Sequence, residues 1–212
     1  TLLGGYLAAS ITDTLQGLVM VAVAVVVPIA TVVHCGGIGA FVERVGAVDA
    51  PGFLEALKAG GIPLKGPALV LGAGGAGRAV AFALREAGLE VWVWNRTPQR
   101  ALALAEEFGL RAVPLEKARE ARLLVNATRV GLEDPSASPL PAELLPEEGA
   151  VVDLVYRPLW TRFLREAQER GLKVQTGLPM LAWQGALAFR LWTGLLPDPS
   201  GMEEAARRAL GV

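Results

Sequence analysis

The stretch "LVLGAGGAGRAVAFALREAGLEVWVWNRTPQR", Leu69 to Arg100, carries a glycine pattern between a short apolar strand and a helix. Gly72, Gly74 and Gly77 have the spacing G-x-G-x-x-G. Gly72 permits a tight turn, Gly74 lets the backbone approach a pyrophosphate, and Gly77 lets the helix pack closely on the strand. The free N–H groups at the start of the helix also favour an anion. The stretch therefore predicts a dinucleotide-binding strand–helix–strand unit.

The end of the second strand indicates which dinucleotide binds. NAD enzymes usually place Asp or Glu there to bind the ribose 2′-hydroxyl, whereas this chain has Asn95, followed by Arg96, Thr97 and Arg100. Arg and Thr can pair with a 2′-phosphate that an acid would repel. NADP(H) is therefore favoured over NAD. The alternative is that Arg96 and Arg100 are only solvated residues, but a helix start disfavours cations.

Outward from this stretch, short apolar segments alternate with amphipathic ones. We expect strands at 68–71, 90–94, 123–126, 150–155 and 173–175. Helices are expected in "APGFLEALKAGG" with Pro51 at its first position, from Gly75, from Pro98 and from Trp160, with one long helix at the end. Residues 133–149, rich in Pro and acids, are expected to form a surface loop. The pattern predicts an α/β fold with a doubly wound parallel sheet.

Composition divides the chain into two parts. Of its 212 residues 52% are hydrophobic and 19% charged, and the mean hydropathy is +0.42. Residues 1–48 hold only Asp13, Glu43 and Arg44 as charged residues, so we expect an apolar segment at 1–48 and a globular domain at 49–212. A net charge of −1 gives no basic footprint for nucleic acid. The single cysteine, Cys35, excludes an internal disulfide, and no metal site is expected.

The N-terminal part contains the uninterrupted apolar run "GLVMVAVAVVVPIATVV", Gly17 to Val33. Its length suits a membrane helix, which would tolerate the kink expected at Pro28. We therefore expect membrane contact through residues 15–33, with the C-terminal side in the cytoplasm because Arg44 and Lys58 follow the run. A buried core helix is the alternative, and a signal peptide is disfavoured because no Lys or Arg precedes the run.

Residues 4–30, "GGYLAASITDTLQGLVMVAVAVVVPIA", resemble a transmembrane segment of the sodium:solute symporter family. The shared features are the Gly-Gly start, the pair Thr12–Asp13, Gln16 and the apolar run. The resemblance covers about one helix, and a transport site is built between several helices. Transport by this chain alone is therefore not expected.

From Asp49 to the C-terminus the chain resembles the shikimate dehydrogenase family. The motifs that carry the resemblance are "GAGGAGRA", "NRTPQRA", "LVNATRVG", "VVDLVYRPLWTRFLREA" and "TGLPMLAWQGALAFRLWTG". It implies a Rossmann-like NADP domain and reduction of 3-dehydroshikimate to shikimate with NADPH, a step of aromatic amino-acid biosynthesis. Quinate remains a possible alternative substrate.

The resemblance also implies residue roles. Cofactor contacts are implied for Gly74, Gly75, Ala76, Asn95, Arg96, Thr97 and Arg100, with Asn126, Ala127 and Thr128 near the adenosine ribose or the nicotinamide. Gly177 and Met180 would line the nicotinamide, while Tyr156 and Gln184 would bind the substrate. The alternative for the last two is a buried polar pair that ties the final helix to the sheet.

The family's catalytic pair is a Lys and an Asp. Asp49, in "VDAPG", stands at the position of the Asp, but Ala47 and Val48 replace the Asn and Thr that precede it in the family. The 212 residues contain no "N-x-T-x-P-x-K" stretch, in which the family carries its Lys, and no N-terminal "S-x-S" motif. Because reduction of a ketone needs a proton donor, we expect NADPH binding with very weak or absent turnover.

Three hypotheses follow: a shikimate dehydrogenase with an intact NADP domain, a membrane-tethered NADP-binding module without catalysis, and a chimeric symporter–dehydrogenase reading frame. In the family the last helix packs on the substrate domain. Here its Trp183, Phe189 and Trp192 are expected to leave an apolar patch that promotes self-association.

Overall fold

The computed structural model describes residues 49–211, which fall within one compact unit of the chain. The predicted apolar helix and the membrane contact at residues 15–33 lie outside the described residues. Within residues 49–211, no helix combines the length and the apolar character needed to cross a bilayer.

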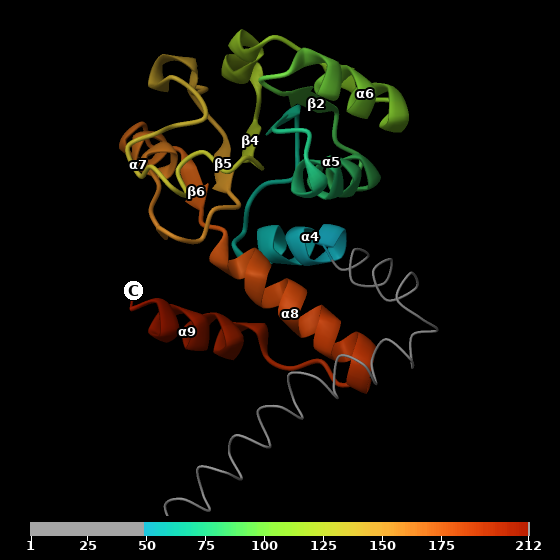
Figure 1. Ribbon diagram of the computed structural model, residues 1–212, viewed down its shortest axis with the longest axis vertical. Helices are drawn as coiled ribbons and strands as arrows, with labels where there is room; N and C mark the ends of the chain where they lie inside the picture. The colour runs from blue at the N-terminus through green and yellow to red at the C-terminus, as the bar shows by residue number, and fades with distance from the viewer. Residues whose placement is uncertain (1–48, 212) are drawn as a thin grey trace, which may run out of the picture. The chain divides into compact units, whose positions relative to one another are not determined.

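A six-stranded parallel sheet, in the order β3-β2-β1-β4-β5-β6, forms the centre of the unit (Figure 1). The strands are β1 Ala68–Leu71, β2 Val91–Trp94, β3 Arg111–Ala112, β4 Leu123–Asn126, β5 Ala150–Asp153 and β6 Lys173–Gln175. The chain moves outward from β1 to β3 and then returns to place β4 on the other side of β1. This reversal confirms the predicted doubly wound sheet, and ligands of such sheets bind at the carboxyl ends of the strands beside it.

Residues 49–211 also form six α-helices and two 3₁₀ turns. They are α4 Asp49–Ala59, α5 Gly75–Glu86, α6 Pro98–Phe108, η2 Leu115–Glu120, η3 Ala142–Leu144, α7 Arg162–Glu169, α8 Leu178–Thr193 and α9 Pro199–Leu210. α4 packs against α5 and α8, and α9 packs against α8, as Figure 1 also shows. Several ends carry the expected signals: α6 starts with Pro98 and ends at Gly109 in the left-handed region.

Alternate residues of each strand pack on opposite faces of the sheet. In β1, Ala68 and Val70 join a core with α4, α5, α6 and the start of α8, whereas Leu69 and Leu71 join a second core with α7 and the two 3₁₀ turns. All four residues of β1 are buried. Burial on both faces explains why this strand is an unbroken apolar run rather than an alternating one.

Several predicted boundaries are wrong by one or two residues. The helix in "APGFLEALKAGG" begins at Asp49 rather than Pro51, and β2 begins at Val91 rather than Glu90. α7 begins at Arg162 rather than Trp160, because the Thr161 side chain accepts a hydrogen bond from Leu164 N and caps the helix. The short edge strand β3 had no clear apolar signal and was not predicted.

Three longer segments also differ from the sequence prediction. The strand expected at 150–155 ends at Asp153, whose side chain accepts a bond from Val155 N. The single final helix is two helices, because α8 ends at Gly194 in the left-handed region and Asp198 caps α9. The loop at 133–149 is not wholly on the surface: Leu140 and Leu145 are buried in the second core, and η3 lies between them.

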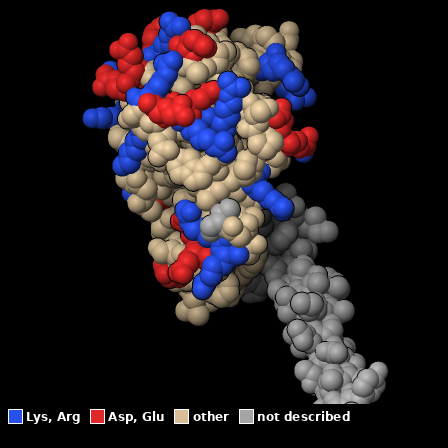
Figure 2. Space-filling view, turned by 90° about the vertical axis from the view of Figure 1, so that its left-hand side faces the viewer, with Lys and Arg blue, Asp and Glu red and all other residues tan. Residues whose placement is uncertain are grey.

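The face of the molecule shown in Figure 2 mixes Lys and Arg with Asp and Glu. Exposed ion pairs of the described residues include Arg85–Glu86, Arg122–Glu148 and Arg129–Glu133. Exposed pairs of this kind add little to stability. The cores on the two faces of the sheet therefore hold the fold together.

Candidate functional site

The glycine loop after β1 has the geometry that its spacing predicts. Gly72 has a φ of +111°, which favours glycine. A Cβ on Gly77 would lie 2.0 Å from Gly72 O, so this position needs glycine for packing. A Cβ on Gly74 or Gly75 would meet no atom within 4 Å. The loop is therefore tightly packed against the backbone of Gly72 at Gly77. At Gly74 and Gly75, where α5 begins, there is open space beside the backbone.

Asn95, at the end of β2, holds this loop in place. Its Oδ1 accepts a bond from Ala73 N at 3.2 Å, and its Nδ2 donates to Thr97 O at 3.0 Å. The next residues on the chain include Arg96 and Arg100, which are exposed. Both line the same groove as Gly72 and Gly74. The carboxyl end of β2 thus presents two cations, and no acid, beside the glycine loop.

Asn126, at the end of β4, is completely buried, and its side chain makes all its hydrogen bonds inside the protein. Oδ1 accepts from Thr128 N at 3.0 Å and Thr128 Oγ1 at 2.7 Å. Nδ2 donates to Val130 O at 3.2 Å and to Asp153 Oδ1 at 2.9 Å. Asn126 therefore shapes the turn at Ala127 and Thr128, and these two residues line the groove.

Asp153, at the end of β5, supports that turn through its hydrogen bond with Asn126. Besides Asn126 Nδ2, it accepts bonds from Val155 N at 3.0 Å and from Thr161 Oγ1 at 2.6 Å. Burial raises the pKa of Asp153 to about 6, although these bonds act in the opposite direction. Asp153 was not among the residues predicted from the sequence. The available signal was an acid closing the otherwise apolar strand "AVVD".

The glycine loop, the end of β2 and the turn at Ala127 and Thr128 line a groove of about 780 Å³ at the carboxyl ends of β1, β2 and β4. Its lining also includes Trp94, Arg129, Val130, Glu133, Ser138 and Pro139, none of which the sequence analysis had selected. The groove fits NADP(H) in three respects: space for a pyrophosphate at Gly74, the start of α5 for its charge, and two arginines for a 2′-phosphate. Arg129 is paired with Glu133 at the rim.

A second group of predicted residues lies where α4 meets α8. Gln184 Nε2 donates a hydrogen bond to Asp49 Oδ1 at 2.8 Å. Both residues are partly buried. The helices approach closely because of Gly52, where a Cβ would lie 2.9 Å from Gln184 Cγ. Burial raises the pKa of Asp49, and the bond from Gln184 offsets this only in part.

The start of α8 holds the residues expected beside the nicotinamide. A Cβ on Gly177 would lie 2.4 Å from Leu154 O, so only glycine allows α8 to start this close to the end of β5. Met180 is buried on α8 one turn before Gln184. Tyr156, by contrast, is 41% exposed. The alternative of a buried Tyr156–Gln184 pair is therefore wrong, since Gln184 bonds to Asp49.

The predicted residues thus form two groups. The groove brings together Gly72, Gly74, Asn95, Arg96, Arg100, Ala127 and Thr128. The helix contact brings together Asp49 and Gln184. Gly75, Ala76, Gly77, Thr97, Asn126, Tyr156, Gly177 and Met180 line neither of these directly. Within residues 49–211, His, Cys, Asp and Glu form no group of three that could hold a metal ion.

Two family models match this domain. Residues 63–129 match the model described as shikimate / quinate 5-dehydrogenase, and residues 177–207 match the shikimate 5′-dehydrogenase C-terminal domain. A curated relative, a shikimate dehydrogenase (NADP(+)) of Thermus thermophilus, is 86% identical over 198 residues, which cover 86% of this chain and 75% of that protein. This chain belongs to the shikimate dehydrogenase family.

Solved structures of the family have the same fold. A shikimate 5-dehydrogenase from another strain of Thermus thermophilus, in complex with NADP(H) and shikimate, matches with a TM-score of 0.76 and 96% identity over 77% of this chain. The quinate dehydrogenase of Corynebacterium glutamicum, in complex with NAD, matches with a TM-score of 0.67 and 33% identity over 74% of this chain. The present chain spans 62% and 60% of these two solved chains.

A third family model, for the sodium:solute symporter family, matches residues 1–81. Its second part overlaps α4, β1 and the first half of α5. In the structure these elements belong to the sheet and its covering helices, as expected for the dehydrogenase family. The symporter-like segment at residues 4–30 lies outside the described residues.

Proposed function

We propose that this chain binds NADP(H) in the groove at the carboxyl ends of β1, β2 and β4, and that it forms the cofactor-binding part of a shikimate dehydrogenase. The observation that carries the proposal is the combination of open space at Gly74 with Arg96 and Arg100 on the same groove. The two Thermus thermophilus relatives support it, since one is an NADP(+) enzyme and the other was solved with NADP(H).

Each wall of the groove has a distinct role in the proposal. The N–H groups at the start of α5 bind the pyrophosphate, and Arg96 and Arg100 bind the 2′-phosphate. The turn at Ala127 and Thr128, held by Asn126, lies against the ribose or nicotinamide. Gly177 and Met180 lie at the start of α8, outside the groove lining, and in the proposal they present a soft apolar surface to the nicotinamide ring that extends beyond the groove. The bound cofactor supplies or accepts the hydride.

Asp49 and Gln184 form the substrate side of the proposed site, with Tyr156. Because burial raises the pKa of Asp49, its carboxyl is protonated more readily than that of an exposed aspartate. Gln184 fixes the orientation of Oδ1 by its bond at 2.8 Å. A lysine partner of the family type is not among the 212 residues at the expected motif, so the proposed activity toward shikimate is weak.

The double variant Arg96→Ala/Arg100→Ala tests the cofactor assignment. Loss of the charge-assisted bonds to a 2′-phosphate should weaken NADPH binding by about 10- to 100-fold. NADH lacks that phosphate, so its binding should change by less than about threefold. Fluorescence titration of the full chain with each nucleotide measures both values.

Arg85→Ala is the matched control, because Arg85 is an exposed arginine at the end of α5 and pairs with Glu86. It should leave both affinities unchanged. Equal losses for NADPH and NADH in the double variant would contradict the assignment of the 2′-phosphate site. No saturable binding of NADPH to the parent chain would overturn the proposed function itself.

The symporter match at residues 1–81 favours a second candidate function, a membrane-tethered NADP-binding module. In this proposal residues 15–33 contact a membrane and the NADP domain lies in the cytoplasm. Flotation of the full chain with phospholipid vesicles tests it, with the 49–212 fragment as control. Equal flotation of the two, or none by either, would contradict membrane contact through the N-terminal segment.

A further inference from the structure

One wall of the cofactor groove is a long connection rather than a strand end. After β4 the chain runs through residues 127–139, of which Glu133, Ser138 and Pro139 line the groove at a distance in sequence from the turn held by Asn126. Glu133 to Ser136 are exposed. The position of this part therefore depends on contacts outside the turn.

The connection contains a compact local turn. Asp134 Oδ1 accepts bonds from Ser136 N at 2.9 Å and from Ser136 Oγ at 2.6 Å. Ser138 Oγ donates to Leu140 O at 2.8 Å, next to the point where Leu140 enters the second core. These bonds give the segment a shape but do not attach its exposed turn to the sheet.

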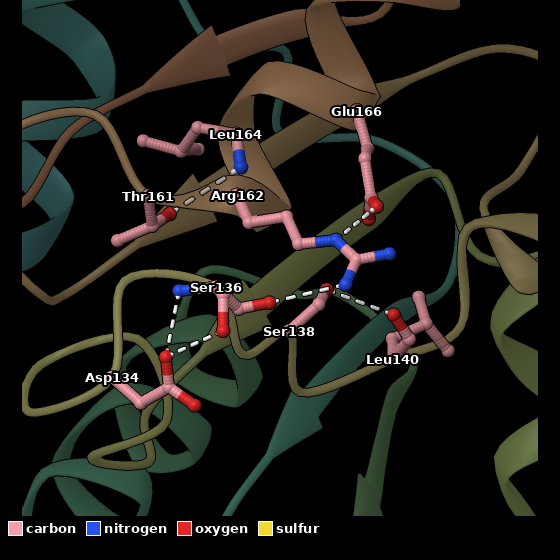
Figure 3. A network of polar contacts seen from close by, with 8 residues as sticks. All are labelled: Asp134, Ser136, Ser138, Leu140, Thr161, Arg162, Leu164 and Glu166. Carbon is pink, nitrogen blue, oxygen red and sulfur yellow. Dashed lines mark hydrogen bonds and ion pairs between the residues drawn. The ribbon is translucent and has the colours of Figure 1, made fainter.

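Arg162 makes that attachment from the first residue of α7. Its Nη1 donates to Ser136 O at 3.1 Å, across 26 residues of sequence. Its Nε donates to Glu166 Oε1 at 2.6 Å, one turn further along the same helix. Figure 3 shows the guanidinium between Glu166 and the turn of Asp134 and Ser136.

Glu166 orients the guanidinium. Its side chain is only 16% exposed, and its Oε2 is buried without a hydrogen-bond partner. A carboxylate in this position needs a nearby cation, and Arg162 is the cation that contacts it. Glu166 therefore holds the guanidinium of Arg162 at Nε, and Nη1 is directed at Ser136 O.

We propose that Arg162 is a positioning residue of the cofactor groove. By holding the turn at Ser136, Arg162 fixes the wall formed by Glu133, Ser138 and Pro139. It thereby sets the affinity for NADP(H) without contacting the cofactor. This inference rests on the proposed function. Arg162 itself does not line the groove. Its effect passes through the backbone of the connection.

Arg162→Ala in the full chain tests the proposal. Loss of one bond to a charged donor should weaken NADPH binding by about 3- to 10-fold. Arg165→Ala is the matched control, since Arg165 lies on the same helix and its guanidinium donates to Trp160 O rather than to the connection. The affinity of the Arg165→Ala variant for NADPH should stay within about twofold of the parent value.

Two further variants separate positioning from general stability. Arg162→Ala leaves Glu166 unpaired, so Arg162→Ala/Glu166→Gln removes that charge and should recover thermal stability while affinity stays low. Asp134→Ala loosens the turn that Arg162 holds, so its effect on affinity should not add to that of Arg162→Ala. Hydrogen exchange of the amides of residues 133–140 should be faster in the Arg162 variants and unchanged in Arg165→Ala.

Reduced affinity with faster exchange in the double variant supports the proposal. Unchanged affinity in Arg162→Ala/Glu166→Gln, while the parent binds NADPH, overturns the role of Arg162 and leaves the proposed function intact. Absence of NADPH binding by the parent overturns both, and the exchange data then report only the attachment of the turn.

Discussion

At the residue scale, the buried side chain of Asn126 shapes the turn at Ala127 and Thr128, and these two residues line the groove. Asn126 was predicted to lie at the cofactor, yet its amide is fully used by Thr128, Val130 and Asp153. A polar residue at a strand end can contact a ligand or shape the turn that does so. Sequence indicates the position, whereas the choice depends on partners from other strands, here Asp153.

The buried carboxyl of Asp153 predicts a pH dependence of stability. Its pKa rises from 3.8 to about 6 on folding, so the folded protein binds this proton more tightly than the unfolded chain. The resulting stabilisation is fully present below pH 3.8 and is lost as the pH rises through about 6. A shift of this size corresponds to about 3 kcal/mol.

Asp153→Asn should lack this dependence. The free energy of unfolding of the parent, minus that of the variant, should therefore fall by about 3 kcal/mol between a pH below 3.8 and a pH above about 6. Urea unfolding at several pH values measures the difference, in which other titrating groups cancel. A difference that stays constant with pH would show that Asp153 is not the group responsible.

At the element scale, the two glycines Gly74 and Gly77 of the loop have different roles: Gly74 is expected to leave room for the cofactor, and Gly77 allows close packing. Gly74→Ala adds a methyl group where no atom lies within 4 Å, so the thermal midpoint should stay within about 2 °C. The methyl should nevertheless obstruct the pyrophosphate and weaken NADPH binding at least about tenfold. Gly77→Ala places its methyl 2.0 Å from Gly72 O and should destabilise the fold by about 1–3 kcal/mol.

Thermal unfolding and NADPH titration of the two variants check this pair of expectations. A large loss of stability in Gly74→Ala, or none in Gly77→Ala, would contradict the geometry of the loop. The spacing in the sequence was sufficient to predict these two roles. It did not predict β3 or the break between α8 and α9, because a two-residue edge strand has little pattern and Gly194 ends a helix only in its left-handed conformation.

At the scale of the whole molecule, the end of α8 and the connection after it expose Phe189, Leu191, Trp192, Leu195 and Leu196. An apolar patch was predicted on this helix, although the predicted residues also include Trp183, which is half-buried against the core that contains Val70. An exposed group of this kind favours association. We therefore predict that the full chain self-associates at micromolar concentration in the absence of detergent.

Sedimentation of the parent and of Trp192→Glu/Leu195→Glu tests this prediction. The charged variant should shift toward the monomer, since Trp192 lies in the last turn of α8 and Leu195 in the connection after it, and both are exposed. Arg190→Glu, a charge change on the same helix outside the apolar group, is the control and should not have this effect. A parent chain that is monomeric without detergent would contradict the prediction.

We propose that the groove beside β1, β2 and β4 binds NADP(H), although the 212 residues contain no lysine motif of the family type. The most direct test measures NADPH binding and shikimate-dependent reduction of NADP⁺ on one sample of the full chain. We predict saturable binding of NADPH, tighter than that of NADH, with turnover about 10²- to 10⁴-fold below that of a relative carrying the lysine. Absence of saturable NADPH binding, or turnover equal to that relative's, would contradict the account.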